Sequence, residues 1–280
     1  MPELPEVETV CRGLAKILPG RVIKAVRQNR ADLRIPFPTR LKTVQGCKIS
    51  AVARRAKYIL LTLDDGRTLV VHLGMSGRLV VYSQGKKYSP EKHDHMILTM
   101  DDGTTVVFND PRRFGLVALT ETETLAHHRF FTHLGPEPFD KKFSPAALAE
   151  KLAGKKTAIK LALMDQRLVV GVGNIYASEA LFEAGINPAR AAQSLQPGEI
   201  KNLVPAIRKT LKAAIKAGGS SLRNYVQADG ELGYFQHRWA VYGKQGRKCR
   251  GCTCSIEKTG GVQRMTQGGR STFYCPVKQK

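Results

Sequence analysis

The chain has 280 residues, of which 42% are hydrophobic and 24% charged, so it can bury one or two ordinary cores and is neither a disordered tail nor a collagen. Forty-five lysines and arginines outnumber 23 acidic residues and give a formal net charge of +22. From residue 201 to residue 280, sixteen basic residues stand against three acidic ones. Because this charge has to be held on the surface against its own repulsion, it predicts a polyanionic partner.

Neither a membrane partner nor secretion is expected from the sequence. No window reaches the roughly 18 consecutive apolar residues of a spanning helix, and the opening MPELPEVE carries three glutamates where a signal peptide carries lysines. We therefore expect a cytoplasmic protein. In a reducing compartment, four cysteines within the last 32 residues predict metal ligands. We expect the other two, Cys11 and Cys47, to be small buried apolar residues.

In chain order, the first predicted element is a helix over residues 6–18, where apolar residues follow helical spacing until Pro19-Gly20. Residues 21–120 contain short runs rich in Val, Ile, Leu and Thr, and two Asp-Asp-Gly sequences divide such runs into β-hairpins. About eight strands result, as in a β-sandwich or flattened barrel. Helical spacing then predicts four helices, over 144–154, 157–166, 174–185 and 198–219.

This change of pattern predicts an α+β protein with four segments. A β-rich domain with one N-terminal helix covers residues 1–132, and a proline-bearing polar linker covers 133–145. The helical domain, 146–235, includes a polar stretch without periodicity that suits a mobile loop. Residues 236–280 form a basic hairpin closed by cysteines.

The second residue is the first candidate for chemistry. Removal of Met1 would leave Pro2 with a terminal secondary amine, which is nucleophilic and can form an iminium ion with an aldehyde carbon. A terminal amine has a pKa near 8, against about 10.4 for lysine. The alternative is a frayed terminus with no role, which spacing alone favours. Glu3 beside it either shuttles protons or, with the nearby Glu6 and Glu8, only offsets the positive end of the helix.

Four further segments carry candidates for contact with nucleic acid. Lys57 follows two arginines in a predicted strand. Basic strand residues usually lie on a solvated face or contact phosphates, and this explanation of Lys57 is at least as good as catalysis. Met75 in HLGMSG and Phe114 in NDPRRFG are core residues by default, but the glycines and proline predict exposed turns. From such turns an apolar side chain and Arg112 could wedge into a base stack. For His93 in EKHDH, a surface loop or phosphate contact is preferred to a metal site.

The sequence GVGNIYASEALFEAG places two glycines and Asn174 immediately before a predicted helix. Backbone N–H groups would converge there, as they do around a bound DNA phosphate, although ordinary helix capping explains the pattern equally well. Lys155 and Lys160 lie at the start of the preceding helix and could reach the same DNA backbone.

The cysteine cluster predicts a zinc site with one irregular ligand. Cys249 and Cys252 form one knuckle and Cys275 begins a second, but Lys278 stands where the fourth thiolate is expected. Cys254 could substitute and complete a site for one zinc ion per chain, although three ligands within six residues strain a tetrahedron. The alternative is a finger without tightly held metal. Structural zinc supplies on the order of 10 kcal/mol to a small motif, so the missing ligand bears on whether the hairpin is ordered.

Ten motifs, which run in order over essentially the whole chain, resemble bacterial formamidopyrimidine-DNA glycosylases: MPELPEVETV, RRAKY, HLGMSG, KHDH, NDPRRFG, THLGPEPF, TAIK with LMDQ, VVGVGNIYASEALF, SLRNYVQADGELGYF and GGRSTFYCP. Leu4-Pro5 favours this purine-specific branch over the related endonuclease VIII branch. The resemblance implies a catalytic β-sandwich domain, a helix-two-turn-helix DNA-binding domain and a zinc-finger-like hairpin. It also implies a bifunctional base excision repair enzyme, a glycosidase and lyase that removes 8-oxoguanine and formamidopyrimidines and cleaves the abasic strand by β,δ-elimination.

The resemblance further assigns roles to single residues. Pro2 would form a Schiff base at C1′ with Glu3 as proton donor, while Lys57 would assist β-elimination and Arg270 δ-elimination. The segment 220–234 would close over the damaged base. The remaining family positions would fill the gap left by the everted nucleotide (Met75, Arg112, Phe114) or contact phosphates (His93, Lys155, Asn174).

The implied partner is damaged double-stranded DNA, bound by a monomer in the cytoplasm, at the nucleoid of a bacterium. A lesion base must leave the stack at a cost of a few kcal/mol, which wedge residues and phosphate contacts offset. Two alternatives stay open, a non-catalytic DNA-binding protein and the pyrimidine-specific relative. Lys278 and the long segment between Cys252 and Cys275 depart from the family pattern, so zinc and the placement of Arg270 are hypotheses.

Overall fold

The computed structural model describes residues 2–220, 233–252 and 255–280. Contacts divide the chain into two compact units, each formed by two stretches of sequence. Unit 1 contains Met1–Thr132 and Ile215–Gln236, and unit 2 contains His133–Ala214 and His237–Lys280. The stretch expected as a linker, 133–145, therefore lies within unit 2, where the backbone N–H of Gly135 donates to the carbonyl of Gln166 at 2.8 Å.

Unit 1 begins with helix α1, Leu4–Ala15. Glu3 caps the helix through a reciprocal capping box with Glu6, which explains why α1 starts earlier than the apolar periodicity predicted. One face of the helix is buried, including Val7, Val10 and Leu14. These side chains join the core of the strands that follow.

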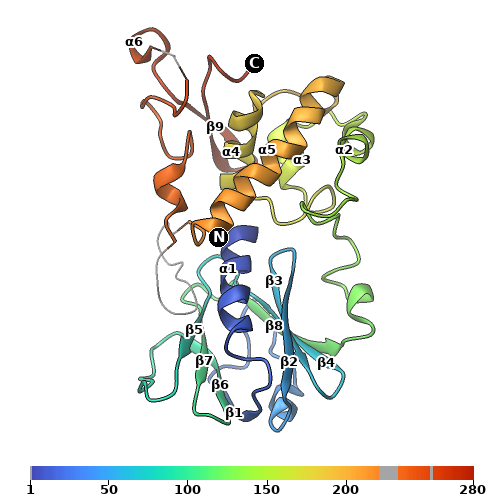
Figure 1. Ribbon diagram of the computed structural model, residues 1–280, viewed down its shortest axis with the longest axis vertical. Helices are drawn as coiled ribbons and strands as arrows, with labels where there is room; N and C mark the ends of the chain where they lie inside the picture. The colour runs from blue at the N-terminus through green and yellow to red at the C-terminus, as the bar shows by residue number, and fades with distance from the viewer. Residues whose placement is uncertain (1, 221–232, 253–254) are drawn as a thin grey trace. The chain divides into compact units, whose positions relative to one another are not determined.

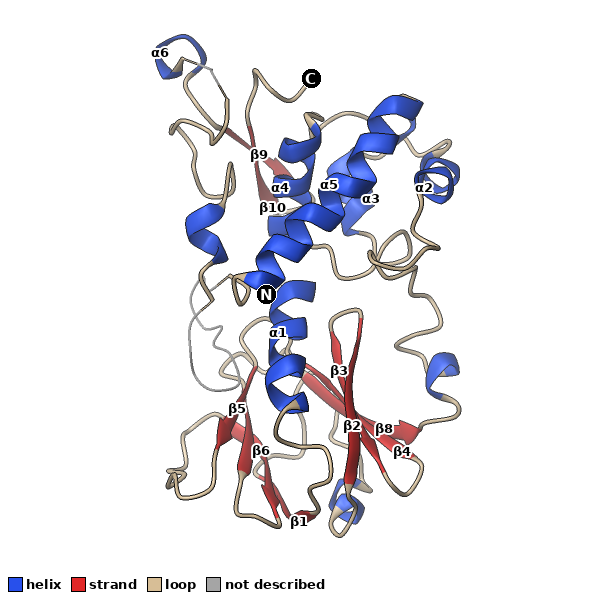
Figure 2. Ribbon diagram, in the orientation of Figure 1, coloured by secondary structure: helices blue, strands red, loops and turns tan. Residues whose placement is uncertain are grey.

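Eight strands, as predicted, form two four-stranded antiparallel sheets in unit 1, with orders β1-β6-β7-β5 and β2-β3-β4-β8. Figure 2 shows them as two separate groups of strands, and their apolar faces share one core with α1. Each Asp-Asp-Gly turn has its glycine at positive φ, +85° at Gly66 and +86° at Gly103, a conformation that glycine adopts at no steric cost. The strands are β1 Ile23–Gln28, β2 Ile49–Arg55, β3 Tyr58–Leu63, β4 Arg67–His72, β5 Arg78–Tyr82, β6 Asp94–Met100, β7 Thr105–Asn109 and β8 Leu116–Glu121, with short 3-10 helices at Leu41–Val44 and Leu125–His127.

Unit 2 is mainly helical and ends in a two-stranded hairpin. Its elements are α2 Pro145–Leu152, α3 Ile159–Met164, α4 Asn174–Ala184, α5 Pro197–Lys216, α6 Ile256–Thr259, β9 Gln263–Gln267 and β10 Arg270–Tyr274, with 3-10 turns at Ala192–Ser194 and Phe235–Arg238; α5 and the second of these turns cross the boundary between the units. Gly268 and Gly269, both at positive φ, turn the chain between β9 and β10. Strand β10 packs against α4, so the hairpin belongs to the helical unit. The α+β prediction is confirmed.

The cysteines outside the hairpin differ from each other. Cys11 is buried as expected, and its burial raises the pKa of the thiol to about 12. Cys47, also expected to be buried, is only partly buried, and its thiol donates to Asp65 Oδ2 at 3.1 Å. Among the helices in the described part of the chain, none is long and apolar enough to cross a membrane.

Candidate active site and nucleic-acid interface

The first described residues, from Pro2 onward, are buried in unit 1. Pro2 is buried, and Glu3 and Glu6 are each 2% exposed, unlike a frayed terminus. The backbone N–H of Glu3 donates to Glu6 Oε2 at 2.8 Å, which fixes the first turn of α1. A secondary amine placed here would have a carboxyl group beside it and little water around it, which is the setting that nucleophilic catalysis with proton transfer requires.

Glu6 also holds a second segment of unit 1 beside this terminus. Its Oε1 accepts a hydrogen bond of 2.8 Å from the backbone N–H of Ser220. Gly219, at φ +81°, lies so close that a Cβ there would be 3.1 Å from Glu6 Cγ. The sequence assigned Glu6 only to the positive end of the helix, although the Glu3-x-x-Glu6 spacing of a capping box was a readable signal.

The two ends of the segment 220–234 lie together. Ser220 and Tyr234 form an antiparallel bridge, and Phe235 N–H donates to the carbonyl of Gly219 at 2.9 Å. A Cβ on Gly233 would lie 2.5 Å from that same carbonyl oxygen, so only glycine fits. The ends are thus fixed beside Glu6, in the first turn of α1. Residues 221–232, expected to form the closing loop, lie outside the described residues.

Lys57 lies in a strained turn next to α1. It is 7% exposed and occupies the two-residue turn between β2 and β3 together with Ala56, whose φ is +52°. A left-handed non-glycine residue costs of order 1 kcal/mol or more, so its surroundings have to hold it. Arg54 does so, donating to the carbonyl of Ala56 at 2.8 Å and to Glu8 Oε2 of α1 at 2.9 Å.

The environment of Lys57 is basic and dry. Burial, together with the positive charges of Lys57 and Arg34, lowers the pKa of His72 to about 4. His72 is therefore neutral near pH 7, and its Nδ1 accepts a hydrogen bond of 3.0 Å from the backbone N–H of Gly74. This histidine was not singled out by sequence, because a single His within an apolar strand carries no pattern.

Two apolar side chains in neighbouring loops of unit 1 are exposed, as the wedge hypothesis requires. Met75 is 40% exposed and Phe114 is 46% exposed. The guanidinium carbon of Arg112 lies 4.9 Å from the centre of the Phe114 ring, in cation–π contact. His93 is partly exposed, whereas His95 is buried with Nε2 2.9 Å from the carbonyl of Asp110.

In unit 2, the structure places Lys160 differently from the sequence expectation. Its side chain is fully buried, and Nζ donates to Asn174 Oδ1 at 2.5 Å and to Thr272 Oγ1 at 2.6 Å. A side chain shielded in this way is not available to a DNA phosphate, so the expectation for Lys160 has to be corrected. The short helix α3 turns this position inward, where its ammonium holds α4 and β10 together.

Asn174 is the first residue of α4, after Gly173 as the cap. Its Nδ2 donates to Tyr242 Oη at 3.1 Å and to the carbonyl of Ser271 at 3.0 Å. Asn174 and Lys160 thereby fix the strand that begins with the exposed Arg270.

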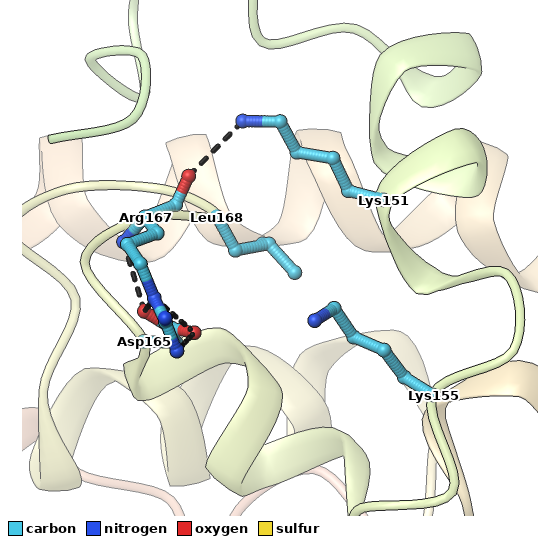
Figure 3. Close-up of a pocket in the computed structure, with 5 residues that line it drawn as sticks. All are labelled: Lys151, Lys155, Asp165, Arg167 and Leu168. Carbon is cyan, nitrogen blue, oxygen red and sulfur yellow. Dashed lines mark hydrogen bonds and ion pairs between the residues drawn. The ribbon is translucent and has the colours of Figure 1, made fainter. Parts of the chain in front are cut away.

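Lys155 lines a hollow of about 340 Å³ in unit 2, together with Lys151, Asp165, Arg167 and Leu168. Figure 3 shows both lysines pointing across it toward Asp165 and Arg167. Lys151 Nζ donates to the carbonyl of Arg167 at 3.0 Å, and Arg167 pairs with Asp165 at 2.8 Å. This pairing lowers the pKa of Asp165, with a smaller contribution from Lys155. The hollow therefore has a positive rim, as phosphate contact requires.

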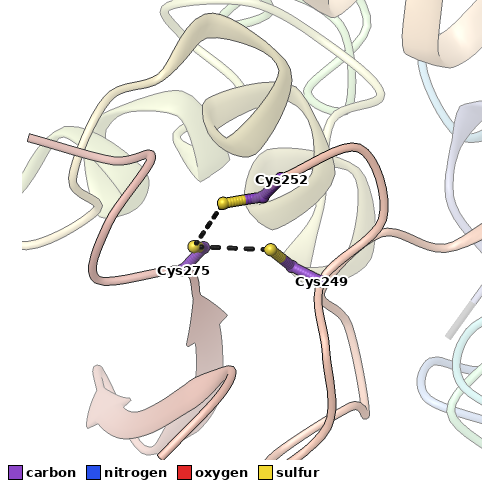
Figure 4. A group of neighbouring side chains, drawn as sticks. All are labelled: Cys249, Cys252 and Cys275. Atoms are coloured by element: carbon purple, nitrogen blue, oxygen red, sulfur yellow. Dashed lines mark hydrogen bonds between the residues drawn. The ribbon is translucent and has the colours of Figure 1, made fainter. Parts of the chain in front are cut away.

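Three of the expected metal ligands converge in unit 2 (Figure 4). The Sγ atoms of Cys249, Cys252 and Cys275 lie within 4.8 Å of one another, and Cys275 Sγ is 3.4 Å from that of Cys249 and 3.7 Å from that of Cys252. Two thiolates on one tetrahedral zinc lie about 3.8 Å apart, given Zn–S bonds of about 2.3 Å, so the three residues fit this ion. Cys254 lies outside the described residues.

Lys278 does not point at this cluster. Its Nζ lies 4.1 Å from the centre of the Phe182 ring in α4, while its backbone N–H donates to Cys275 Sγ at 3.5 Å. The residue in the expected fourth position therefore keeps the backbone contact of a knuckle, but its side chain makes a cation–π contact instead of binding metal.

Comparison with known proteins agrees with this architecture. The family profile "Formamidopyrimidine-DNA glycosylase N-terminal domain" matches residues 1–117, and "Formamidopyrimidine-DNA glycosylase H2TH domain" matches residues 134–226. Formamidopyrimidine-DNA glycosylases of Cereibacter sphaeroides and Rhodospirillum rubrum are 50% identical over 287 residues and 49% identical over 281 residues, each with 100% of both chains covered.

Solved structures give the same result. A Lactococcus lactis Fpg mutant in complex with a Fapy-dG containing DNA has a TM-score of 0.90 at 34% identity, with 100% of both chains covered. The L. lactis Fpg in complex with an abasic site containing DNA has a TM-score of 0.89 at 35% identity, with 99% of both chains covered. Fold and site together define a DNA glycosylase of base excision repair. The chain belongs to the formamidopyrimidine-DNA glycosylase family, whose members combine glycosylase and abasic-site lyase activity.

Proposed function

We propose that this glycosylase removes oxidised purines, 8-oxoguanine and formamidopyrimidines, through a Schiff base on Pro2. The secondary amine attacks C1′ of the everted nucleotide and the damaged base leaves, with Glu3 donating and relaying the proton. The resulting iminium ion acidifies the C2′ hydrogen, so the 3′ phosphate is eliminated first and the 5′ phosphate second. Lys57 assists the first elimination and Arg270 the second.

One observation carries this proposal: Pro2 and Glu3 are buried, unlike the residues of a frayed terminus. Pro2 and Glu3 are both buried, and Glu6 accepts hydrogen bonds from the backbone N–H groups of Glu3 and Ser220. The capping box and the bond from Ser220 compensate the burial of both carboxylates, so two acidic groups are held at the start of α1, next to the residue that would carry the amine.

The proposed DNA contacts are those of the matching family positions, and the exposure of Met75 and Phe114 supports them. Met75, Arg112 and Phe114 fill the gap in the duplex, and the phosphate contacts come from His93, Lys155 and Asn174. Lys160 acts indirectly, since its buried ammonium orients Asn174 and the strand of Arg270. The net charge of +22 supports binding of double-stranded DNA. We propose that the protein binds it as a monomer in the cytoplasm.

For the metal, we propose one zinc ion per chain held by four thiolates, those of Cys249, Cys252, Cys254 and Cys275. The spacing of the three described sulfur atoms supports it. When bound, the ion supplies folding free energy to the hairpin and takes no part in the reaction.

The decisive experiment is borohydride trapping on duplex DNA with an abasic site. A covalent complex is expected, and peptide mapping should place the adduct on the N-terminal residue. Pro2→Gly and a preparation that retains Met1 should both lose trapping and strand cleavage while still binding a duplex with a tetrahydrofuran site. If either kept both activities, Pro2 would not be the nucleophile; a wild type that binds without trapping would be the non-catalytic alternative.

Lesion duplexes then separate the two branches of the family. Excision of 8-oxoguanine and formamidopyrimidines in preference to oxidised pyrimidines is expected. The reverse preference would place the chain with the pyrimidine-specific relatives.

A further inference from the structure

The two loops that carry Met75 and Phe114 touch through their main chains. Gly74 has φ +62°, and a Cβ there would lie 2.3 Å from the carbonyl carbon of Phe114 and 2.4 Å from the backbone nitrogen of Gly115. Any side chain at position 74 would therefore force the loops apart. The two exposed apolar side chains are held close because nothing separates the backbones beneath them.

A buried carboxylate and a hydroxyl join the same two loops. Asp110 is 0% exposed and Ser76 is 3% exposed. Asp110 Oδ1 accepts a hydrogen bond of 2.5 Å from Ser76 Oγ, and Oδ2 accepts one of 2.8 Å from the backbone N–H of Gly115. Ser76 Oγ in turn accepts one of 3.1 Å from the backbone N–H of Arg112. One hydroxyl thus donates to and accepts from the opposite loop.

Asp110 is itself fixed from two directions. Its backbone N–H donates to the carbonyl of His93 at 3.0 Å, and its carbonyl oxygen lies 2.9 Å from His95 Nε2. Arg113 lies between Arg112 and Phe114 and has φ +59°. A loop without these hydrogen bonds would relax this strained backbone conformation. The carboxylate therefore connects a strained turn to the rigid sheet.

We propose that Ser76 and Asp110 are positioning residues that hold Met75, Arg112 and Phe114 as one preformed wedge. This inference rests on the proposed role of those three side chains in DNA. Separate flexible loops would have to lose conformational freedom when they enter the base stack, whereas loops joined beforehand do not. The pair touches no reacting atom, and its effect is confined to the step in which the base is evicted.

The test compares two substrates with Ser76→Ala, Asp110→Asn and Ser76→Thr. Ser76→Ala removes both side-chain hydrogen bonds between the loops, and Asp110→Asn disrupts the one that Asp110 Oδ1 accepts from Ser76 Oγ. Single-turnover excision of 8-oxoguanine should fall about 10-fold in each variant, equivalent to about 1.4 kcal/mol. Cleavage and trapping at a preformed abasic site should stay within about twofold, because no base remains to evict. Ser76→Thr keeps the hydroxyl and should restore most of the rate. Ser83→Ala, an exposed serine of the same unit, is the matched control.

Two further measurements keep the outcomes separate. Hydrogen exchange of the Arg112 and Gly115 amides should accelerate in Ser76→Ala while exchange in the sheets does not change. Equal loss on both substrates, or no loss on either, would overturn the positioning role. A double variant, Met75→Ala with Phe114→Ala, tests the wedge itself. If this variant excises 8-oxoguanine at the unchanged rate, the wedge role is wrong and the positioning role with it. The trapping result for Pro2 does not depend on this outcome.

Discussion

His72 should make the stability of unit 1 sensitive to mild acid. Burial, with Lys57 and Arg34 nearby, lowers its pKa to about 4, whereas in the unfolded chain a histidine has a pKa of about 6.5. Between these values the unfolded state binds more protons, so this contribution is complete above about pH 6.5 and is lost as the pH falls toward 4. The full difference corresponds to about 3 kcal/mol, and the part lost between pH 7 and pH 5 to about 2 kcal/mol.

The informative change is His72→Asn, which cannot titrate. The Asn Oδ1 can take over the acceptor position that His72 Nδ1 offers to the Gly74 N–H at 3.0 Å. Loss of the ring contact with Tyr58, at 4.9 Å between centroids, should destabilise the variant by about 1 kcal/mol at pH 7. At pH 5, however, the wild type should have lost about 2 kcal/mol more than the variant, so the order of stability should reverse.

The assay is hydrogen exchange of β3 and β4 amides in mild urea at both pH values, which reports on unit 1 alone. Other carboxylates and histidines titrate equally in both proteins and cancel in the difference. If the gap between wild type and variant changes by less than about 0.5 kcal/mol from pH 7 to pH 5, the assigned protonation of His72 is wrong. An NMR titration of the His72 ring gives an independent check, and an ordinary histidine midpoint there would refute the reasoning equally.

Three shorter predictions concern other parts of the chain. Lys160→Met should lower the unfolding free energy of unit 2 by about 2–4 kcal/mol, because the buried oxygens of Asn174 and Thr272 lose their hydrogen-bond donor. Urea unfolding followed by Trp239 fluorescence measures this change, and a value below about 0.5 kcal/mol would contradict the prediction. Lys278→Cys places a thiol where the fourth ligand is expected, so it can replace Cys254, whose position among three ligands within six residues strains the tetrahedron. Zinc release to a chelator should then slow by about an order of magnitude, whereas the matched Lys280→Cys should not change it; equal rates would show that position 278 does not reach the metal. Phe114→Ala should weaken lesion excision more than abasic-site binding, and equal losses would rule out its wedge role.

Local sequence pattern was enough to predict most helices and strands, and to identify the N-terminal residue as a candidate nucleophile. The Asp-Asp-Gly turns, the alternation of the strands and the helical spacing all act between near neighbours in the chain, so they can be read without a fold. The reactive chemistry of an N-terminal Pro2 is likewise a property of the residue itself. Family resemblance added roles at matching positions, and the family assignment is confirmed.

What the tertiary structure alone decided involves residues that are distant in sequence. Glu6 accepts from Ser220, 214 positions away, and Lys160 donates to Thr272, 112 positions away. Pairs of this kind produce no periodic pattern in the sequence, since each of the two residues is equally compatible with an exposed position. Lys160 was therefore expected at a DNA phosphate and is instead buried, while Lys278 lies on an aromatic ring. A polar side chain shows its type in the sequence, but its partner, and hence its task, depends on which surfaces the folded chain brings together.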